Sequence, residues 1–272
     1  MSKDYTNAPP EGWKGFDQFV VDMTTYRLPA TTALAGSEST FDFEASTGFP
    51  AHAMSLRFGD TKVAWASGER QGQDEYEAIM VAPDVYFVSF LVSATDTECH
   101  AVVFNTETRR AVHVHNWIKA EAKAGEPRIG QRFAGGVLAG GEASGLVPHP
   151  TKELTGMKAI YTYSQDHDYE HYYITSNYFC WKGLSGAQKG DAAIEPAEYW
   201  KFADGQYVFG WTEMIIPCSP IWFVCFDGSF GDNRETGVFC NTNPDSTMRV
   251  EPAGAVIQKI SQTFYPNRFE KL

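Results

Sequence analysis

The two halves of the chain repeat one ordered series of residues, and this repeat restricts the fold more than any single motif does. The segment from Trp65 reads WASGERQGQDEYE, and the segment from Trp181 reads WKGLSGAQKGDAAIEPAEYW. Each contains a tryptophan, then Ser-Gly, a further glycine after three residues, and later a Glu-Tyr pair. Upstream, the LAG beginning at Leu34 corresponds to the LTG beginning at Leu154. A series that keeps its order over this length indicates two copies of one folding unit.

Most segments between the turns have the composition of β-strands. They are rich in Val, Phe, Trp and Tyr, and turn-forming pairs such as Gly59-Asp60 separate them. Examples from the first half are KVAWAS, VYFVSFLVS, AVVFN and AVHVHNW, and from the second half IYTYS, YFCWKG, QYVFGWTE and IWFVCFD. We therefore predict an all-β chain of two lipocalin-like (calycin) antiparallel β-barrel halves that arise from the internal repeat. Closure into barrels would remove exposed strand edges.

The predicted domains are residues 1–145, which comprise an N-terminal arm and the first barrel, and residues 146–272, which form the second barrel. Prolines interrupt the first fifty residues, which therefore favour an arm laid over the core. Residues 120–156 are dense in Gly and Pro and lack a sustained apolar period, so we predict a connection between the halves, with the boundary near 140–152.

Composition excludes several classes of partner. The net charge of −12 and the pI near 5.0 would repel nucleic acid and anionic lipid alike. The chain has no apolar run of about 18 residues, and its first residues lack the order of a secretion signal. We expect a cytoplasmic protein that binds neither nucleic acid nor membrane.

The cysteines and histidines show no recognised metal-site spacing. The five cysteines include no C-x-x-C pair, which favours reduced, mostly buried thiols. His113 and His115 would face the same side of one strand, but no acidic or histidine companion stands at a familiar spacing. A hydrogen-bonding or surface role is favoured over metal binding, so we predict no metal and no cofactor.

Tyrosines are concentrated in two neighbouring strand segments. Tyr161 and Tyr163 stand two apart, so their side chains would share one face, and we expect that face to point into the second barrel. The returning strand would place Tyr169, His171 and Tyr173 together on one side. The alternative is that these tyrosines are ordinary strand residues whose rings only pack.

The segment GWTEM suggests an acid–base group. Glu213 would share a face with Trp211, and a carboxyl beside an indole inside an aromatic barrel would have a raised pKa suited to proton transfer. The alternative is a solvated glutamate at the end of a strand. Lys189, in the loop SGAQKGD, corresponds to Arg70 in the first half and could hold a substrate anion at the barrel rim, unless it is a solvated loop residue.

The overall layout, with the stretch YTYSQDHDYEHYYITSNYFCWKGLSGAQKGDA in its second half, resembles the MoaF family of lipocalin-like β-barrels. The second half is also similar to phenolic acid decarboxylase, a small cofactor-free barrel with an I-Y-T-Y strand, a Tyr-Glu pair, a Ser-Gly loop with an arginine, and W-T-E. That resemblance implies hydroxyl donors at Tyr161 and Tyr163 and an acid or base at Glu213. The arginine is missing, because Lys189 is the nearest cation and lies about one residue out of register.

From these residues we predict a cofactor-independent lyase, decarboxylase or isomerase that acts on a small phenolic molecule in the second barrel. Its catalytic residues would be Glu213, Tyr161 and Tyr163. Its substrate-binding residues would be Tyr169, Trp211, Lys189, His171 and Tyr173. The alternative function is a non-catalytic carrier of a small hydrophobic ligand. In a third interpretation the repeat is purely structural, and the first half serves as a lid or as a homodimer surface.

Overall fold

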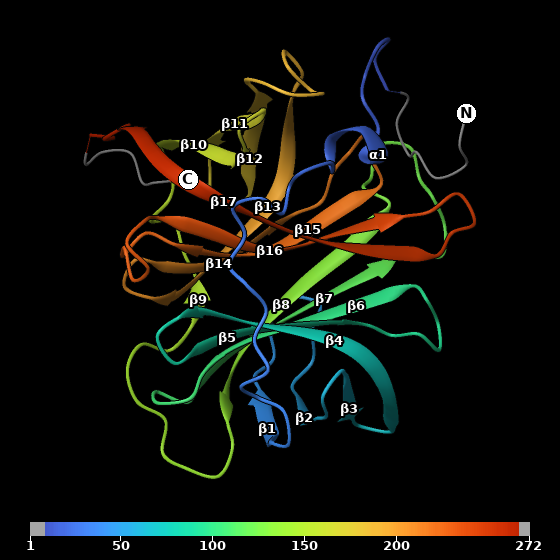
Figure 1. The fold of residues 1–272 in the computed structure, drawn as a ribbon, viewed down its shortest axis with the longest axis vertical. Coiled ribbons are helices and arrows are strands. Elements are labelled where there is room, and N and C mark those ends of the chain that lie inside the picture. Colours follow the sequence, from blue (N-terminus) through green and yellow to red (C-terminus); the bar gives the residue numbers. More distant parts are fainter. Residues whose placement is uncertain (1–8, 267–272) are drawn as a thin grey trace.

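The structure is a computed structural model that describes residues 9–266, so the outer ends of both predicted domains, residues 1–8 and 267–272, lie outside the described part. The predicted all-β class and the two barrels are confirmed (Figure 1). Strands β1 to β8 form one closed barrel, and β10 to β17 form a second, which closes through the pairing of β12 with β13. The described residues contain no helix with the length and hydrophobicity needed to cross a bilayer.

The strands follow one another as antiparallel neighbours in each barrel. The first barrel contains β1 (Glu38–Phe43), β2 (His52–Phe58), β3 (Lys62–Ser67), β4 (Arg70–Ala82), β5 (Val85–Leu91), β6 (Glu98–Asn105), β7 (Arg110–Ile118) and β8 (Ile129–Leu138). The short β9 (His149–Pro150) pairs with β13 at Trp200 and Lys201. The second barrel contains β10 (Met157–Ser164), β11 (His167–Tyr173), β12 (Tyr178–Gly183), β13 (Ala192–Ala203), β14 (Gln206–Trp211), β15 (Cys218–Cys225), β16 (Arg234–Thr242) and β17 (Met248–Gln262).

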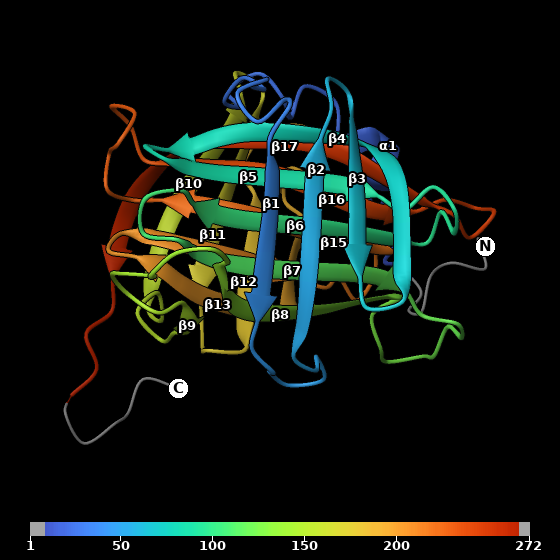
Figure 2. The same cartoon turned by 90° about the horizontal axis from the view of Figure 1, so that it is seen from below.

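The repeated residues occupy equivalent places in the two barrels. Trp65 lies on β3 and Trp181 on β12, and the Glu-Tyr pairs lie on the long strands β4 and β13 that follow. Leu34 and Leu154 each stand shortly before the first strand of a barrel. Figure 2 shows how β1 to β3 cross over β5 to β7, with the long β4 curving from one layer into the other. The repeat therefore corresponds strand by strand to a duplicated barrel.

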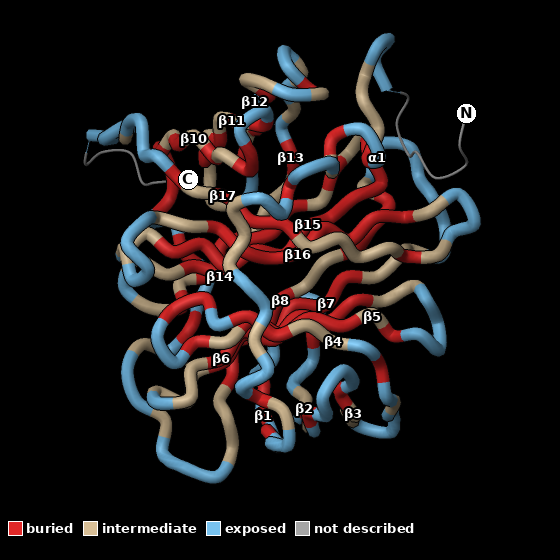
Figure 3. The backbone as a smooth tube through the Cα atoms, in the orientation of Figure 1, coloured by how far each residue is buried: buried red, intermediate tan, exposed pale blue. Residues whose placement is uncertain are grey.

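The barrels pack against each other through a continuous apolar layer. Figure 3 shows buried backbone throughout the region where β5 to β8 face β14 to β16. This layer contains Phe87 and Phe133 from the first barrel and Trp200 and Phe223 from the second. Hydrogen bonds also connect the two barrels across this layer, since Asn116 Nδ2 donates to the carbonyl oxygen of Ser219 at 2.9 Å. Burial on this scale makes the two barrels one packed unit.

The N-terminal arm contacts both barrels. Its one-turn helix α1 (Phe16–Phe19) lies at the second barrel, and the chain then runs across the outside of both barrels to β1 (Figure 1). Phe16, Phe19 and Met23 are buried in the core of the second barrel. Farther along, the Thr31 amide donates to the carbonyl of Ala78 in the first barrel at 2.8 Å. The arm therefore packs into the core of the second barrel and is also bonded to the first barrel.

The prediction that residues 120–156 form a connection was wrong for β8, because residues 129–138 are the strand that closes the first barrel. Its glycines have a low preference for strands, so the sequence of this segment did not indicate one. A Cβ on Gly130 would lie 2.3 Å from the Trp117 ring, and a Cβ on Gly136 would lie 2.4 Å from the carbonyl oxygen of Asp42. Glycine is therefore required here because neighbouring groups approach the backbone closely.

Replacing Gly136 by Ala should lower the free energy of unfolding by about 3 kcal/mol, because the new methyl group would collide with the backbone of β1. Urea unfolding followed by tryptophan fluorescence measures the change. Thr40→Ala, at an exposed position of β1, is the control and should shift the free energy by less than about 0.5 kcal/mol. Equal stability of Gly136→Ala and the wild type would refute the close-packing explanation.

Candidate functional site

The interior of the second barrel is lined mainly by aromatic side chains. Alternate residues of β10 and β11 point inward, so Tyr161, Tyr163, Tyr169, His171 and Tyr173 are all buried. Facing strands add a further aromatic set, namely Phe179, Trp181, Tyr199, Phe209, Trp211, Trp222 and Phe239. The alternation expected from the sequence thus places all five of the predicted β10 and β11 side chains in one core.

A small cavity of about 20 Å³ lies at one end of this core, with room for about one water molecule. Five of the eight residues predicted for the site line it: Tyr163, Tyr169, His171, Trp211 and Glu213. The others on its wall are Phe19, Met23, Trp181, Gln188 and Phe239. Tyr161 and Tyr173 are not part of the wall and lie elsewhere in the core.

Glu213 is buried, with 5% of its surface exposed. The Trp211 indole N–H donates to Glu213 Oε1 at 3.2 Å, whereas Oε2 has no hydrogen-bond partner. Burial raises the pKa of this carboxyl above its usual 4.5, and the Trp211 bond opposes the rise only in part. A carboxyl that titrates nearer to neutrality can both donate and accept a proton.

Two further buried glutamates were not predicted from the sequence. Glu195, on β13, accepts a hydrogen bond from the Met214 amide at 2.8 Å, and burial together with the charge of Glu213 raises its pKa. Glu235, on β16, is fully buried, and burial raises its pKa to about 8. The signal was available, because Glu235 alternates with Gly237 and Phe239 and so shares the face of the strand that Phe239 buries.

The two tyrosines of β10 have different partners. The Tyr163 hydroxyl donates to Glu235 Oε1 at 2.6 Å, which couples the cavity wall to this carboxyl. The Tyr161 hydroxyl is hydrogen-bonded to the Tyr173 hydroxyl. Burial, assisted by neighbouring hydroxyls and Glu235, raises the pKa of Tyr161 and Tyr163 well above 10, so both are neutral hydrogen-bond donors. Tyr161 and Tyr163 therefore lie in one core, but their hydroxyls belong to two separate hydrogen-bond networks.

His171 adds a neutral imidazole to the cavity wall. Its ring stacks on the Tyr161 ring with centroids 4.0 Å apart, and burial lowers its pKa to about 3. Its Nδ1 has no hydrogen-bond partner. His171 therefore carries no charge at neutral pH, and one nitrogen remains available to a ligand.

Lys189 does not line the cavity. It is exposed, and the neighbouring Gln188 is the residue that turns inward and accepts a hydrogen bond from the Tyr169 hydroxyl at 3.0 Å. The tight turn between Gly183 and Gly190 sets this direction, since the Gly183 position approaches the Gln188 carbonyl too closely for any Cβ. Among the described residues that form the cavity wall there is no lysine or arginine.

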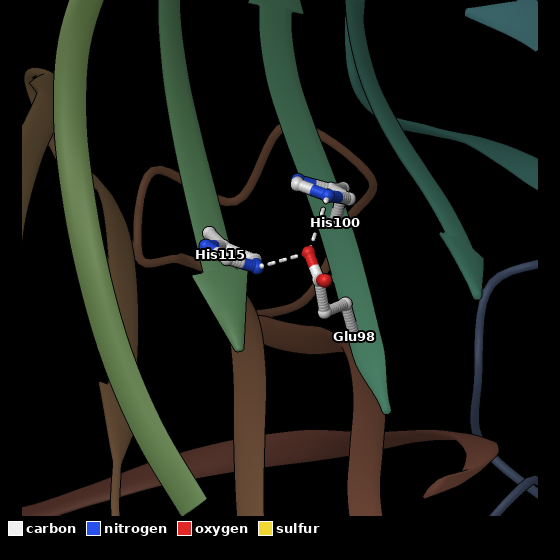
Figure 4. A group of neighbouring side chains, drawn as sticks. All are labelled: Glu98, His100 and His115. Atoms are coloured by element: carbon white, nitrogen blue, oxygen red, sulfur yellow. Dashed lines mark hydrogen bonds and ion pairs between the residues drawn. The ribbon is translucent and has the colours of Figure 1, made fainter. Parts of the chain in front are cut away.

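The first barrel contains a second polar cluster, which the sequence reasoning missed. Glu98 and His100 on β6 lie beside His113 and His115 on β7, since His100 and His115 are direct cross-strand partners. The donor atoms of Glu98, His100 and His115 all lie within 4.8 Å of one another (Figure 4). His113 and His115 have no companion at a familiar metal-site spacing in the sequence, because their companions come from the paired strand rather than from the same one.

Comparison with known proteins agrees with the two-barrel division. The MoaF N-terminal domain model matches residues 11–120, and the MoaF C-terminal domain model matches residues 148–263. Protein MoaF from Klebsiella aerogenes is 32% identical over 202 residues, which is 70% of this chain and 73% of that protein. A solved structure of unknown function from Nostoc punctiforme, in the DUF3598 family, covers 89% of this chain and 99% of its own at 9% identity, but its TM-score of 0.37 carries no argument. On the two domain matches and this sequence identity, the chain belongs to the MoaF family.

Proposed function

We propose that the second barrel is the active site of an acid–base enzyme that acts on a small phenolic molecule without a cofactor in that barrel. The observation that carries the proposal is Glu213, a buried carboxyl with a raised pKa and an unpartnered Oε2 on a cavity wall made mainly of aromatic side chains. Such a pairing of a proton-transfer group with an aromatic enclosure suits a phenol.

The residues support a balanced proton transfer. Protonated Glu213 would give its proton to a side-chain carbon of the substrate, while the phenol proton would pass through the Tyr163 hydroxyl to Glu235 in its ionised form, which is the minor form at neutral pH because the pKa of Glu235 is about 8. The product is a neutral quinone methide with Glu213 ionised and Glu235 protonated. Loss of a proton from another carbon to Glu213, with return of the Glu235 proton to the phenol oxygen, completes an isomerisation. Departure of a neutral carbonyl fragment, whose hydroxyl proton goes to Glu213 and whose bonding electrons stay on the substrate, would complete a lyase reaction. Tyr169 would hold the substrate oxygen.

The charges around the cavity favour a substrate without a carboxylate. No lysine or arginine occurs among the described residues on the wall, and the barrel interior already holds Glu195, Glu213 and Glu235. A buried substrate carboxylate would have no counter-charge there. Within the proposed class, isomerisation or a lyase reaction other than decarboxylation therefore fits the site better than decarboxylation does.

The test is incubation of the protein with a panel of para-hydroxylated aromatic compounds, with and without a carboxylate, in deuterated water. Proton transfer to carbon would introduce deuterium into the side chain, which nuclear magnetic resonance detects even when the product resembles the substrate. Exchange in carboxylate-free members supports the proposal. Release of carbon dioxide from the acids alone would instead identify a decarboxylase.

In the proposed enzyme and in the rival ligand carrier alike, the cavity of about 20 Å³ can admit a phenol only if the N-terminal arm moves, because Phe19 and Met23 of the arm line it. Phe19→Ala should leave a space of about one aromatic ring and lower the free energy of unfolding by about 3 kcal/mol. Added phenol should then raise the melting temperature of Phe19→Ala more than that of the wild type. Val21→Ala, at an exposed position of the same arm, is the control.

Differential scanning fluorimetry over a phenol series measures these shifts. An equal phenol response in all three proteins would show that Phe19 does not close the cavity. A larger response in Phe19→Ala, with no compound of the panel ever converted, would favour the carrier over the enzyme.

A further inference from the structure

The first barrel holds a pocket that the proposed function does not use. It has a volume of about 190 Å³ and is lined by four histidines, His52, His100, His113 and His115, together with Arg70, Arg132 and several apolar side chains. Glu98 lies against this set, 3.1 Å from His115 and 3.9 Å from His100. Histidines and a carboxylate gathered in this way are typical of transition-metal ligands.

A chain of hydrogen bonds fixes which nitrogen of each ring carries a proton. The Pro50 carbonyl can only accept, so His52 Nδ1 donates to it at 2.9 Å, and His52 Nε2 is left to accept. His113 Nδ1 donates to His52 Nε2 at 2.9 Å, so His113 Nε2 accepts in turn from His100 Nδ1 at 2.9 Å. One proton on each ring accounts for all three of these bonds, so no ring in the chain needs a second proton.

This order leaves His100 Nε2 with an unprotonated lone pair. The atom is buried and has no hydrogen-bond partner, and it faces Glu98 Oε2 (Figure 4). Two electron-rich atoms that face each other in a buried site repel unless a positive centre lies between them. His115 Nε2 is directed at the same carboxylate oxygen, so a third donor atom reaches the same point.

We propose that Glu98, His100 and His115 bind one divalent first-row transition metal ion. Metal–donor distances of about 2.0–2.2 Å require the three donor atoms to close on the ion by roughly 1 Å, within the reach of side-chain rotation. Two histidines and one carboxylate leave further coordination positions open, as in non-haem iron and catalytic zinc sites.

The surrounding residues act as an outer shell. The His52–His113 chain orients His100, and Arg70 donates two hydrogen bonds, of 3.0 and 3.1 Å, to the Glu98 carboxylate. Arg132 Nε donates to His115 Nδ1 at 3.1 Å. When His115 Nε2 binds the metal, its proton moves to Nδ1, so Arg132 gives up that bond and keeps its contact with the Gly48 carbonyl.

The charge of the pocket indicates what would fill the open positions. Arg70 and Arg132 carry two positive charges, of which Glu98 balances one, so a divalent ion makes the pocket more positive still. An anionic ligand bound to the metal would offset this charge. The metal would therefore bind together with a small anion such as a carboxylate, in a barrel separate from the acid–base site.

The test is a titration of the chelator-treated, full-length protein with Co²⁺, followed by visible absorption and calorimetry. One equivalent should bind with d–d absorption bands, and azide should shift those bands by occupying an open position. His100→Ala and Glu98→Gln should abolish binding, and His52→Ala should weaken it about 10–100-fold. His149→Ala, at an exposed histidine on β9, should bind as the wild type does.

Circular dichroism establishes that each variant is folded, and His100→Gln replaces His100→Ala if the alanine variant is not. Absence of Co²⁺ binding to the wild type would overturn the proposal. Undiminished binding by folded His100→Ala or His100→Gln would overturn it as well, because the ion would then lie elsewhere.

Discussion

Replacing Glu213 by Gln is expected to lower kcat for proton transfer in the second barrel by about 10²–10⁴-fold, with little change in substrate affinity. The amide keeps the shape of the carboxyl and can still accept the Trp211 hydrogen bond, but it cannot exchange a proton at neutral pH. Binding should persist because Tyr163, Tyr169 and the tryptophans also line the cavity and would contact a ligand independently of this group. Deuterium exchange into the substrate found by the compound panel measures the rate.

The matched control is Glu170→Gln. Glu170 lies on β11 next to His171 but on the outer face, where it pairs with Lys158 at 3.7 Å. Its replacement should leave kcat unchanged. In the wild type, kcat should also fall as rising pH ionises Glu213, and this limb of the pH profile should disappear in Glu213→Gln. Full activity of Glu213→Gln would remove Glu213 from the mechanism.

The free energy of unfolding should fall between pH 6.5 and pH 8. In the folded protein Glu235 has a pKa of about 8, because of burial, so it stays protonated at neutral pH, whereas in the unfolded chain it is ionised. Unfolding then releases a proton, and stability decreases as pH rises toward the folded pKa. The loss is about 1.4 kcal/mol per pH unit, or about 2 kcal/mol from Glu235 over this interval. The raised pKa values of Glu195 and Glu213 act in the same direction.

The buried histidines do not obscure this trend. Burial lowers the pKa of His100, His113, His115 and His171, so their contribution to stability is lost mainly as pH falls below about 6.5. In the unfolded chain these rings are half protonated at pH 6.5 and neutral by about pH 8, which raises stability by only about 0.4 kcal/mol per ring over this interval. The carboxyls therefore dominate the interval from pH 6.5 to 8.

Urea unfolding at several pH values measures this dependence. Glu235→Gln should have a shallower slope, since the amide does not titrate and can still accept the Tyr163 hydroxyl. Glu121→Gln, at an exposed position, is the control and should keep the wild-type slope. A stability that stays constant or rises over this interval would show that the carboxyls are ionised in the folded protein.

Comparison of β8 with β5 and β15 shows which strands can be predicted from the residue types of the strand itself. Strands such as β5 and β15 were predicted because valine and aromatic residues favour a pleated, buried backbone wherever they occur. In β8 the glycines at 130, 135 and 136 serve the rings and backbone of other segments, so the strand lacks the usual composition. When the residues of a strand are selected for close contact with other segments, their types do not indicate a strand.

The sequence alone determined the duplicated all-β architecture and the inward face of β10 and β11. Strand alternation is a property of neighbouring residues, and the repeat is visible when the two halves of the sequence are compared. Only the tertiary structure brought Glu235 to Tyr163, turned Gln188 inward in place of Lys189, and set Glu98 and His100 beside His115. Those encounters depend on strand register and on turn geometry between segments distant in the chain. One residue of register decides which side chains share a face, and no single segment encodes it.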